Sequence, residues 1–338
     1  MEHTTRTCGA AVLSVGLLLS VTACGSDEAS GGGSSASGQE TVDVRFGYIG
    51  DFNGTSLLAV AEDQGCWDDQ ALDVQTTSFT NGPLQIQALG AGDLDFGYIG
   101  PGAMWLPASG QAKIVAINTL GNADRVIAQP GIDSLEDLAG KSVGVPEGTS
   151  GDMILTLALE SVGLTKDDVE VVPLDPSTLV SAFSSGQVDA AGFWYPAIAT
   201  IKQQVPDLVE LAKNEDFSEE VSFPTAFVAS NDLVAEEEET VTRVLAGLRC
   251  AMEFRSENMD ETVQLTADML GLDAAAVEAD ASNVEVLSVE QLDEMTADGT
   301  IERWLTGMND YFVGAGKATD PLDPSEYYTG DLFTGAGE

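Results

Sequence analysis

The order of strand and helix patterns along this chain restricts its fold to one structural class. Val42, Val44, Phe46 and Tyr48 alternate with small or polar residues, as in a strand with one buried face. A helix pattern follows at 57–63, and a second series of strands and helices begins after residue 134. Strands are expected at 42–48, 72–77, 94–99, 114–117, 142–145, 169–172, 190–194 and 225–230. This alternation predicts an α/β architecture built from βαβ units.

The pentapeptide FGYIG occurs at 46–50 and again at 96–100. The residues on either side of the two copies differ and no third copy follows at the same period, which excludes a solenoid repeat. Each copy ends a strand and leads into a helix. Because ligands of open parallel sheets bind beyond the carboxyl ends of the strands, we expect Asp51, Asn53 and Pro101 to face one ligand from adjacent strands.

Three glycine-rich turns supply the other candidate site residues, at 50–55, 100–102 and 147–151. Glycine allows the backbone to approach a ligand closely, although plain turn chemistry remains the alternative for each turn. The strand end at 192–196 carries aromatic side chains that cannot all be buried in one core. A cleft lined by these rings, with Asp51 or Glu147 beside it, suits a ligand with a cationic or apolar part. The candidate ligand-binding residues are Tyr48, Asp51, Asn53, Gly54, Tyr98, Gly100, Pro101, Gly148, Thr149, Ser150, Trp194 and Tyr195.

Charge and residue usage exclude several functions. The chain has 56 acidic and 13 basic residues, a formal net charge of -43, which would repel nucleic acid. The single histidine is His3, so catalytic triads and histidine metal sites have no histidine in the body of the chain. Neither GxxxxGK[ST] nor GxGxxG is present. We therefore predict that the protein is not an enzyme and has no cofactor and no metal site.

The first 24 residues have the pattern of a lipoprotein signal peptide. An apolar run at 10–21, too short to span a bilayer, precedes Val21-Thr22-Ala23-Cys24, which resembles a bacterial lipobox. Residues 25–41 are rich in Gly and Ser and are expected to form a flexible tether. The sequence thus predicts an extracytoplasmic protein held at the cell membrane by lipid on Cys24.

Cys66 and Cys250 remain for the folded body. Export permits a disulfide, but both cysteines lie in helical patterns far apart in the sequence. We expect two buried thiols, with a disulfide as the alternative.

The order of several motifs resembles that of substrate-binding proteins of bacterial ABC importers, in the nitrate, sulfonate and taurine branch. The resemblance covers 42–333. It rests on Gly47-Tyr48, LLAVAEDQGCW at 57–67, GAGDLDFG at 90–97, GQAKIVA at 110–116, SLEDLAGKSVGVPEG at 134–148, LVSAFSSGQVDAA at 179–191 and AFVASN at 226–231.

This resemblance implies a type II periplasmic-binding-protein fold, in which two α/β lobes are joined by two crossing hinge strands. Lobe I would comprise 42–128 plus 228–338 and lobe II 129–227, with crossing strands at 125–129 and 225–230. The protein would act as a monomer that binds a small sulfonate or taurine-like compound and delivers it to an ABC permease. A nitrogenous ring, such as a pyrimidine or flavin precursor, or a role as an anchored ligand sensor are the alternatives. Nitrate and bicarbonate fit less well, because the expected site is roomy and aromatic.

Overall fold

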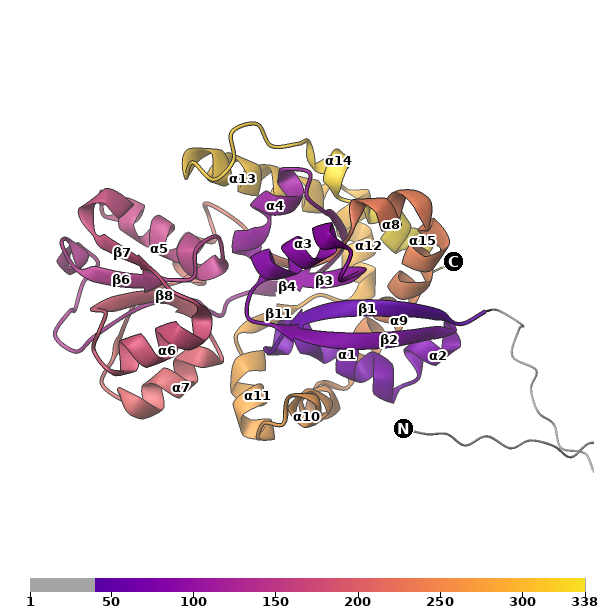
Figure 1. Ribbon diagram of the computed structural model, residues 1–338, viewed down its shortest axis with the longest axis horizontal. Coiled ribbons are helices and arrows are strands. Elements are labelled where there is room, and N and C mark those ends of the chain that lie inside the picture. Colours follow the sequence, from indigo (N-terminus) through magenta and orange to yellow (C-terminus); the bar gives the residue numbers. More distant parts are fainter. Residues whose placement is uncertain (1–39, 338) are drawn as a thin grey trace, which may run out of the picture. The chain divides into compact units, whose positions relative to one another are not determined.

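The computed structural model describes residues 40–337, which form two mixed β-sheets with helices packed against them (Figure 1). The signal peptide expected at 1–24, the lipidation at Cys24 and nearly all of the tether expected at 25–41 lie outside the described residues. The α/β class predicted from the alternating patterns is confirmed. These residues cluster as one compact unit, and their division into two lobes stays a prediction.

The first sheet has the strand order β11-β4-β10-β3-β1-β2. Strand β1 pairs in parallel with β2 and β3, whereas β10 runs antiparallel to β3 and β4, and β11 antiparallel to β4. The strands of this sheet are β1 (Val42–Ile49), β2 (Leu72–Phe79), β3 (Phe96–Ile99), β4 (Lys113–Gly121), β10 (Pro224–Ala229) and β11 (Val284–Val286).

The second sheet has the order β7-β6-β8-β5-β9. Strand β6 pairs in parallel with β7 and β8, and β5 pairs antiparallel with β8 and β9. Helix α5 covers one face, while α6 and α7 cover the other (Figure 1). The strands are β5 (Asp124–Ala128), β6 (Ser142–Val145), β7 (Glu170–Pro173), β8 (Ala190–Trp194) and β9 (Val209–Lys213).

Helices connect the strands and complete the chain after β10. The second series of elements, expected to begin after residue 134, opens with only a 3₁₀ turn, Glu136–Leu138. The helices are α1 (Phe52–Asp63), α2 (Cys66–Asp69), α3 (Gly82–Ala91), α4 (Trp105–Ala108), α5 (Ser150–Ser161), α6 (Pro176–Ser184), α7 (Ala197–Gln204), α8 (Asn231–Glu236), α9 (Glu238–Glu257), α10 (Met259–Leu270), α11 (Ala274–Ala281), α12 (Val289–Ala297), α13 (Thr300–Gly314), α14 (Pro324–Tyr327) and α15 (Gly330–Gly335).

The two FGYIG copies lie side by side in the first sheet. Phe46 of β1 is in register with Phe96 of β3, and the two rings stack with centroids 5.5 Å apart. Phe227 of β10 meets the Phe46 ring edge-on at 5.6 Å, and all three side chains are fully buried. The apolar residues of both copies thus form one core, and Gly50 and Gly100 end neighbouring strands, as the sequence predicted.

The chain passes between the sheets at two short connections. The first is 122–123, between β4 and β5, and the second is 214–223, between β9 and β10. The crossing strands expected at 125–129 and 225–230 are therefore wrong in detail. Residues 125–128 pair within the second sheet and 225–229 within the first, so each segment lies directly after a connection rather than in it.

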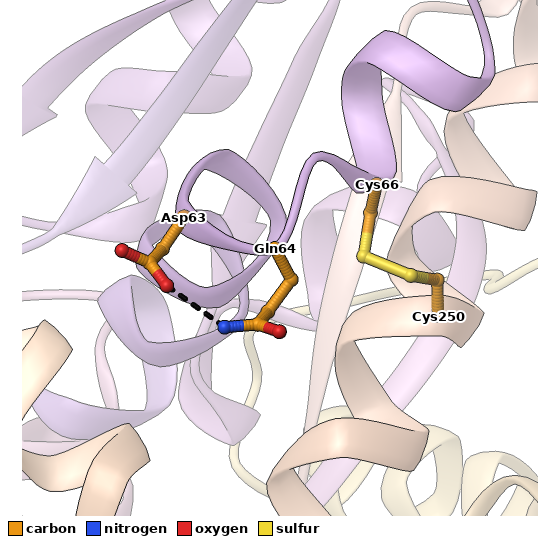
Figure 2. Close-up of a disulfide and its surroundings, with 4 residues drawn as sticks. All are labelled: Asp63, Gln64, Cys66 and Cys250. Atoms are coloured by element: carbon orange, nitrogen blue, oxygen red, sulfur yellow. Dashed lines mark hydrogen bonds between the residues drawn. A yellow bond between two sulfur atoms is a disulfide. The ribbon is translucent and has the colours of Figure 1, made fainter.

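Cys66 and Cys250 form a disulfide with a Cα–Cα distance of 6.0 Å, so the expectation of two free thiols is wrong (Figure 2). The bond joins the start of α2 to α9, which pack together at the rim of the first sheet. Next to it, the Trp67 ring lies where a side chain on Gly247 would be, since a Cβ there would come within 2.4 Å of the ring. This close approach of the helices brings two cysteines 184 residues apart into bonding distance.

Candidate ligand-binding site

A cavity of about 40 Å³ lies where strand ends of the first sheet meet a helix start of the second. The lining is partly aromatic, as expected, and the expectation of a roomy site stays a prediction. The lining residues are Ile49, Asp51, Asn53, Asn81, Gly82, Tyr98, Gly100, Pro101, Ala103, Gly121, Ala123, Asp124, Thr149, Ser150, Trp194, Tyr195 and Thr225.

Asp51 follows β1 and caps helix α1. Its Oδ1 accepts a hydrogen bond from the Gly54 N–H at 2.7 Å, and Asp280 of α11 accepts one from the Phe52 N–H at 2.7 Å. Two carboxyl groups therefore occupy the positive end of the same helix. Burial, then the charges of Asp280 and Asp124, raise the pKa of Asp51 well above its usual value, and burial raises the pKa of Asp280 to about 6.

Hydrogen bonds to β4 fix the first turn of α1. The Asn53 carbonyl accepts from Asn118 Nδ2 at 2.8 Å, and Asn53 Oδ1 accepts from the Thr119 hydroxyl at 2.7 Å. Thr119 in turn bonds the Thr225 hydroxyl at 2.7 Å. Beneath this layer the fully buried Arg255 donates to the Asn118 carbonyl, and burial lowers the pKa of its guanidinium to about 9.

The opposite side of the cavity is the turn before α5. Gly148 has a φ of 71°, a left-handed conformation that favours glycine. Its N–H donates to Asp152 at 3.0 Å, and the Thr149 hydroxyl donates to the Pro146 carbonyl at 2.6 Å. Burial alone would raise the pKa of Asp152, but Lys166 and Lys317 hold it below its usual value. The turn is thus fixed by bonds that leave Ser150 at the cavity wall.

Asp124 is the second carboxyl group at the wall, and it follows the first connection between the sheets. Asn214, in the second connection, forms two hydrogen bonds with it. The Asn214 Oδ1 accepts from the Asp124 N–H at 2.7 Å, and the Asn214 Nδ2 donates to Asp124 Oδ2 at 3.0 Å. Burial raises the pKa of Asp124. The nearby Ser150 hydroxyl, Asn214 and the charge of Arg125 act in the opposite direction and reduce this rise. Within residues 40–337, Asp124 Oδ1 has no hydrogen-bond partner by distance and angle, although the Ser150 hydroxyl lies close enough to lower the pKa of this carboxyl group.

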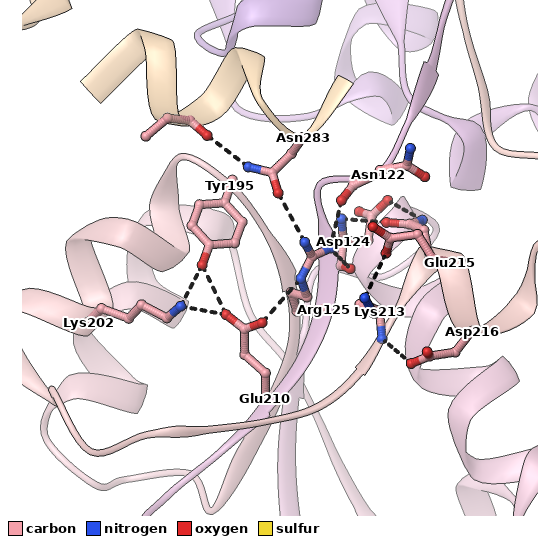
Figure 3. A network of polar contacts seen from close by, with 12 residues as sticks. Asn122, Asp124, Arg125, Tyr195, Lys202, Glu210, Lys213, Glu215, Asp216 and Asn283 are labelled. Atoms are coloured by element: carbon pink, nitrogen blue, oxygen red, sulfur yellow. Dashed lines mark hydrogen bonds and ion pairs between the residues drawn. The ribbon is translucent and has the colours of Figure 1, made fainter. Parts of the chain in front are cut away.

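An ion network lies behind Asp124 (Figure 3). Arg125 lies 3.3 Å from Glu210, without hydrogen-bond alignment, and donates to Asn283 at 3.0 Å. Glu210 also pairs with Lys202 at 2.6 Å and accepts a hydrogen bond from the Tyr195 hydroxyl at 2.9 Å. The network holds the Tyr195 ring at the cavity wall.

Gly102 brings the two sides of the cavity into contact. A Cβ on this residue would lie 2.1 Å from the Thr149 carbonyl carbon and 2.3 Å from the Ser150 nitrogen, closer than any real contact. The Trp105 indole also donates to the Gly148 carbonyl, at 3.5 Å. Only glycine at 102 permits this approach of the 3₁₀ turn Pro101–Ala103 to α5.

The structure brings most of the candidate site residues together. Those that line the cavity are Asp51, Asn53, Tyr98, Gly100, Pro101, Thr149, Ser150, Trp194 and Tyr195. Their role in binding stays a prediction.

Tyr48, Gly54 and Gly148 are not at the cavity wall. Tyr48 lies beside Ile49 in β1, so its side chain points to the opposite face and packs against the core. Gly54 faces the Ile49 carbonyl within α1, and Gly148 packs beside Trp105. Glu147, considered as a second acidic neighbour, is exposed and does not line the cavity.

Several lining residues were not among the candidates, chiefly Asn81, Asp124 and Thr225. Asn81 carries a recognisable sequence signal, because it caps α3 two residues before Pro83. Asp124 has none, since its environment depends on Asn214, 90 residues away.

Two mixed sheets connected twice, with a cavity at their strand ends, define the periplasmic-binding-protein fold. The chain belongs to the NMT1/THI5-like family, whose model matches residues 53–262. A binding protein of Brucella abortus (strain 2308) is 55% identical over 295 residues, 87% of this chain and 92% of that protein. An aliphatic sulfonates-binding protein of Bacillus subtilis (strain 168) is 28% identical over 291 residues, 82% of this chain and 83% of the relative.

A solved structure gives the same fold. The periplasmic aliphatic sulphonate binding protein SsuA from Escherichia coli superimposes with a TM-score of 0.64 at 20% identity, over 84% of this chain and 91% of that one. The resemblance inferred from the motifs is therefore confirmed at the level of family and fold.

The described residues lack two features, a membrane-spanning helix and a metal-binding cluster. In the part of the chain that is described, no helix has the length and apolar character needed to span a bilayer. Residues 40–337 also contain no group of three or more His, Cys, Asp or Glu side chains placed to hold a metal ion.

Proposed function

We propose that this protein is the extracytoplasmic solute-binding component of an ABC importer and that it captures a compact sulfonate or taurine-like compound. The observation that carries the proposal is the composition of the cavity wall, which takes residues from both sheets. A ligand held there touches Asp51 and Pro101 on one side and Ser150 and Trp194 on the other. Such a ligand stabilises the arrangement in which the two sides are close, by the difference in its affinity for the two states.

The proposed lobes would follow the two sheets, lobe I as 42–128 plus 228–338 and lobe II as 129–227. The closed form would then dock on a membrane permease and release the solute. The names of the Bacillus and Escherichia relatives support a sulfonate as the ligand. Lipid attachment at Cys24 and a monomeric state complete the proposal.

A compact nitrogenous ring is the second candidate. Trp194 and Tyr195 line the cavity and offer aromatic faces on which a flat ring can stack. A pyrimidine or a flavin precursor would be such a ring.

A thermal-shift panel tests the proposal directly. The purified protein is heated with taurine, alkanesulfonates, pyrimidines, nitrate and vitamins, one at a time. A true ligand at a hundredfold excess over its Kd adds about 2.7 kcal/mol to the free energy of unfolding. Failure of every compound to raise the melting temperature, or chemical conversion of a compound by the protein, would contradict a solute-binding role for this ligand class.

A further inference from the structure

We propose that Asp51 and Asp124 form a two-sided clamp for a nitrogen head group, so that the ligand carries an ammonium or a similar N–H-rich cation. This inference rests on the proposed function and narrows its ligand class. Of the sulfonates, it selects those with an amine, such as taurine, over nitrogen-free alkanesulfonates.

The first observation is the free oxygen of Asp124. The side chain is 3% exposed and lines the cavity, and its Oδ1 forms no hydrogen bond within residues 40–337. A buried carboxylate oxygen without a donor is costly, and buried polar groups are normally bonded. Asn214 fixes the other oxygen, which leaves Oδ1 available for an N–H of a ligand.

The second observation is the balance of charge at the wall. Asp51 and Asp124 both line the cavity, whereas none of its lining residues, all from the described part of the chain, is Lys, Arg or His. The charge of Arg125 opposes the rise in the pKa of Asp124, but its guanidinium is directed to Glu210, Asn283 and backbone carbonyls and forms no bond with the Asp124 carboxyl group. A cation between Asp51 and Asp124 would stabilise the charged forms of both groups, which burial disfavours.

The aromatic side chains fit the same ligand. Trp194 lines the cavity beside Asp124, and cations are attracted to the face of such a ring, whereas the Tyr195 ring already has Arg125 and Lys202 over it. A sulfonate group carried by the same molecule could accept a hydrogen bond from the Ser150 hydroxyl, which also lines the cavity. The clamp thus decides which end of a zwitterion lies between the carboxylates.

The test compares two probes that differ only in the head group. Taurine carries an ammonium where isethionate, 2-hydroxyethanesulfonate, carries a hydroxyl. Calorimetric titration of the wild-type protein should give a Kd for taurine about tenfold or more below that for isethionate, as expected for a charge-assisted bond. Ethylamine and a small aminopyrimidine, added as further probes, show whether the nitrogen group suffices without a sulfonate.

Variants of Asp51 and Asp124 then show whether these two residues cause the difference in affinity between taurine and isethionate. Asp51→Asn keeps an oxygen that can cap α1, and Asp124→Asn keeps an oxygen for the Asn214 amide. Each should weaken taurine binding about tenfold or more and leave isethionate binding unchanged or tighter. Glu147→Gln is the matched control, because it removes one negative charge from an exposed position near the cavity and should change neither affinity.

The outcomes separate the two proposals. Equal affinity for taurine and isethionate, or equal losses for both in Asp124→Asn, would overturn the clamp and leave the sulfonate-binding function intact. Binding of amines or aminopyrimidines alone would support the clamp and contradict the sulfonate as ligand. Binding of nitrogen-free sulfonates alone would again overturn the clamp.

Discussion

Reduction of the Cys66–Cys250 disulfide should lower the thermal stability of the folded body substantially. The bond closes a loop of 184 residues. In the loop-entropy model, the bond lowers the entropy of the unfolded chain by about 18 cal/mol/K. This raises the free energy of unfolding by about 5 kcal/mol at 25 °C. For a folded body of about 300 residues, the unfolding entropy is about 0.6 kcal/mol/K, so the melting temperature should fall by about 8 °C.

Differential scanning calorimetry with and without reductant measures this shift, and a thiol assay on the same samples shows that the bond has opened. The double variant Cys66→Ala, Cys250→Ala should melt at the temperature of the reduced wild type and be insensitive to reductant. This double variant keeps the contact between Trp67 and Gly247, which lies next to the disulfide. Full reduction without a change in melting temperature would refute the loop-entropy argument for this protein.

Three further changes test other parts of the structure. Gly102→Ala places a methyl group against Thr149, so ligand affinity in a calorimetric titration should fall about tenfold or more, and unchanged affinity would contradict the close approach. Asp280, whose pKa is raised to about 6, contributes stability below pH 4 that is lost as pH rises through 6. Asp280→Asn should therefore gain stability relative to wild type between pH 4 and pH 7 in urea titrations, and a constant difference would argue against it. Trp194→Ala should weaken binding about tenfold while the ligand-free melting temperature stays nearly constant; tight binding by this variant would remove Trp194 from the site.

The sequence predicted the fold well because its signals are local. The alternating strand β1 and the continuous apolar strand β8 lie within a residue of their expected bounds, whereas α1 begins at Phe52, five residues before the expected helix at 57–63. Strands β9 and β11 were missed because they are short, carry polar residues and are only partly buried. Edge strands of this kind are defined by the ladder they join.

The site was predictable only in part, for a physical reason. The turns after β1 and β3 could be assigned to one cavity because parallel strands end at the same edge of a sheet. The position of Asp124 could not, since it is one of 56 acidic residues and depends on a bond to Asn214 in a different connection. The disulfide was misjudged for the same reason, because the packing of α2 on α9 has no signature in the sequence around either cysteine.

The bonds between Asp124 and Asn214 link the start of β5, directly after the first connection, to the second connection through which the chain passes between the sheets. If the sheets rotate about these connections, groups near the axis move least. Asp124 would then keep its place in the open form, while the contact of Gly102 with Thr149 would separate. The expected order of events is first contact at Asp124 followed by enclosure, so that Asp124→Asn would slow ligand association as well as weaken the final complex.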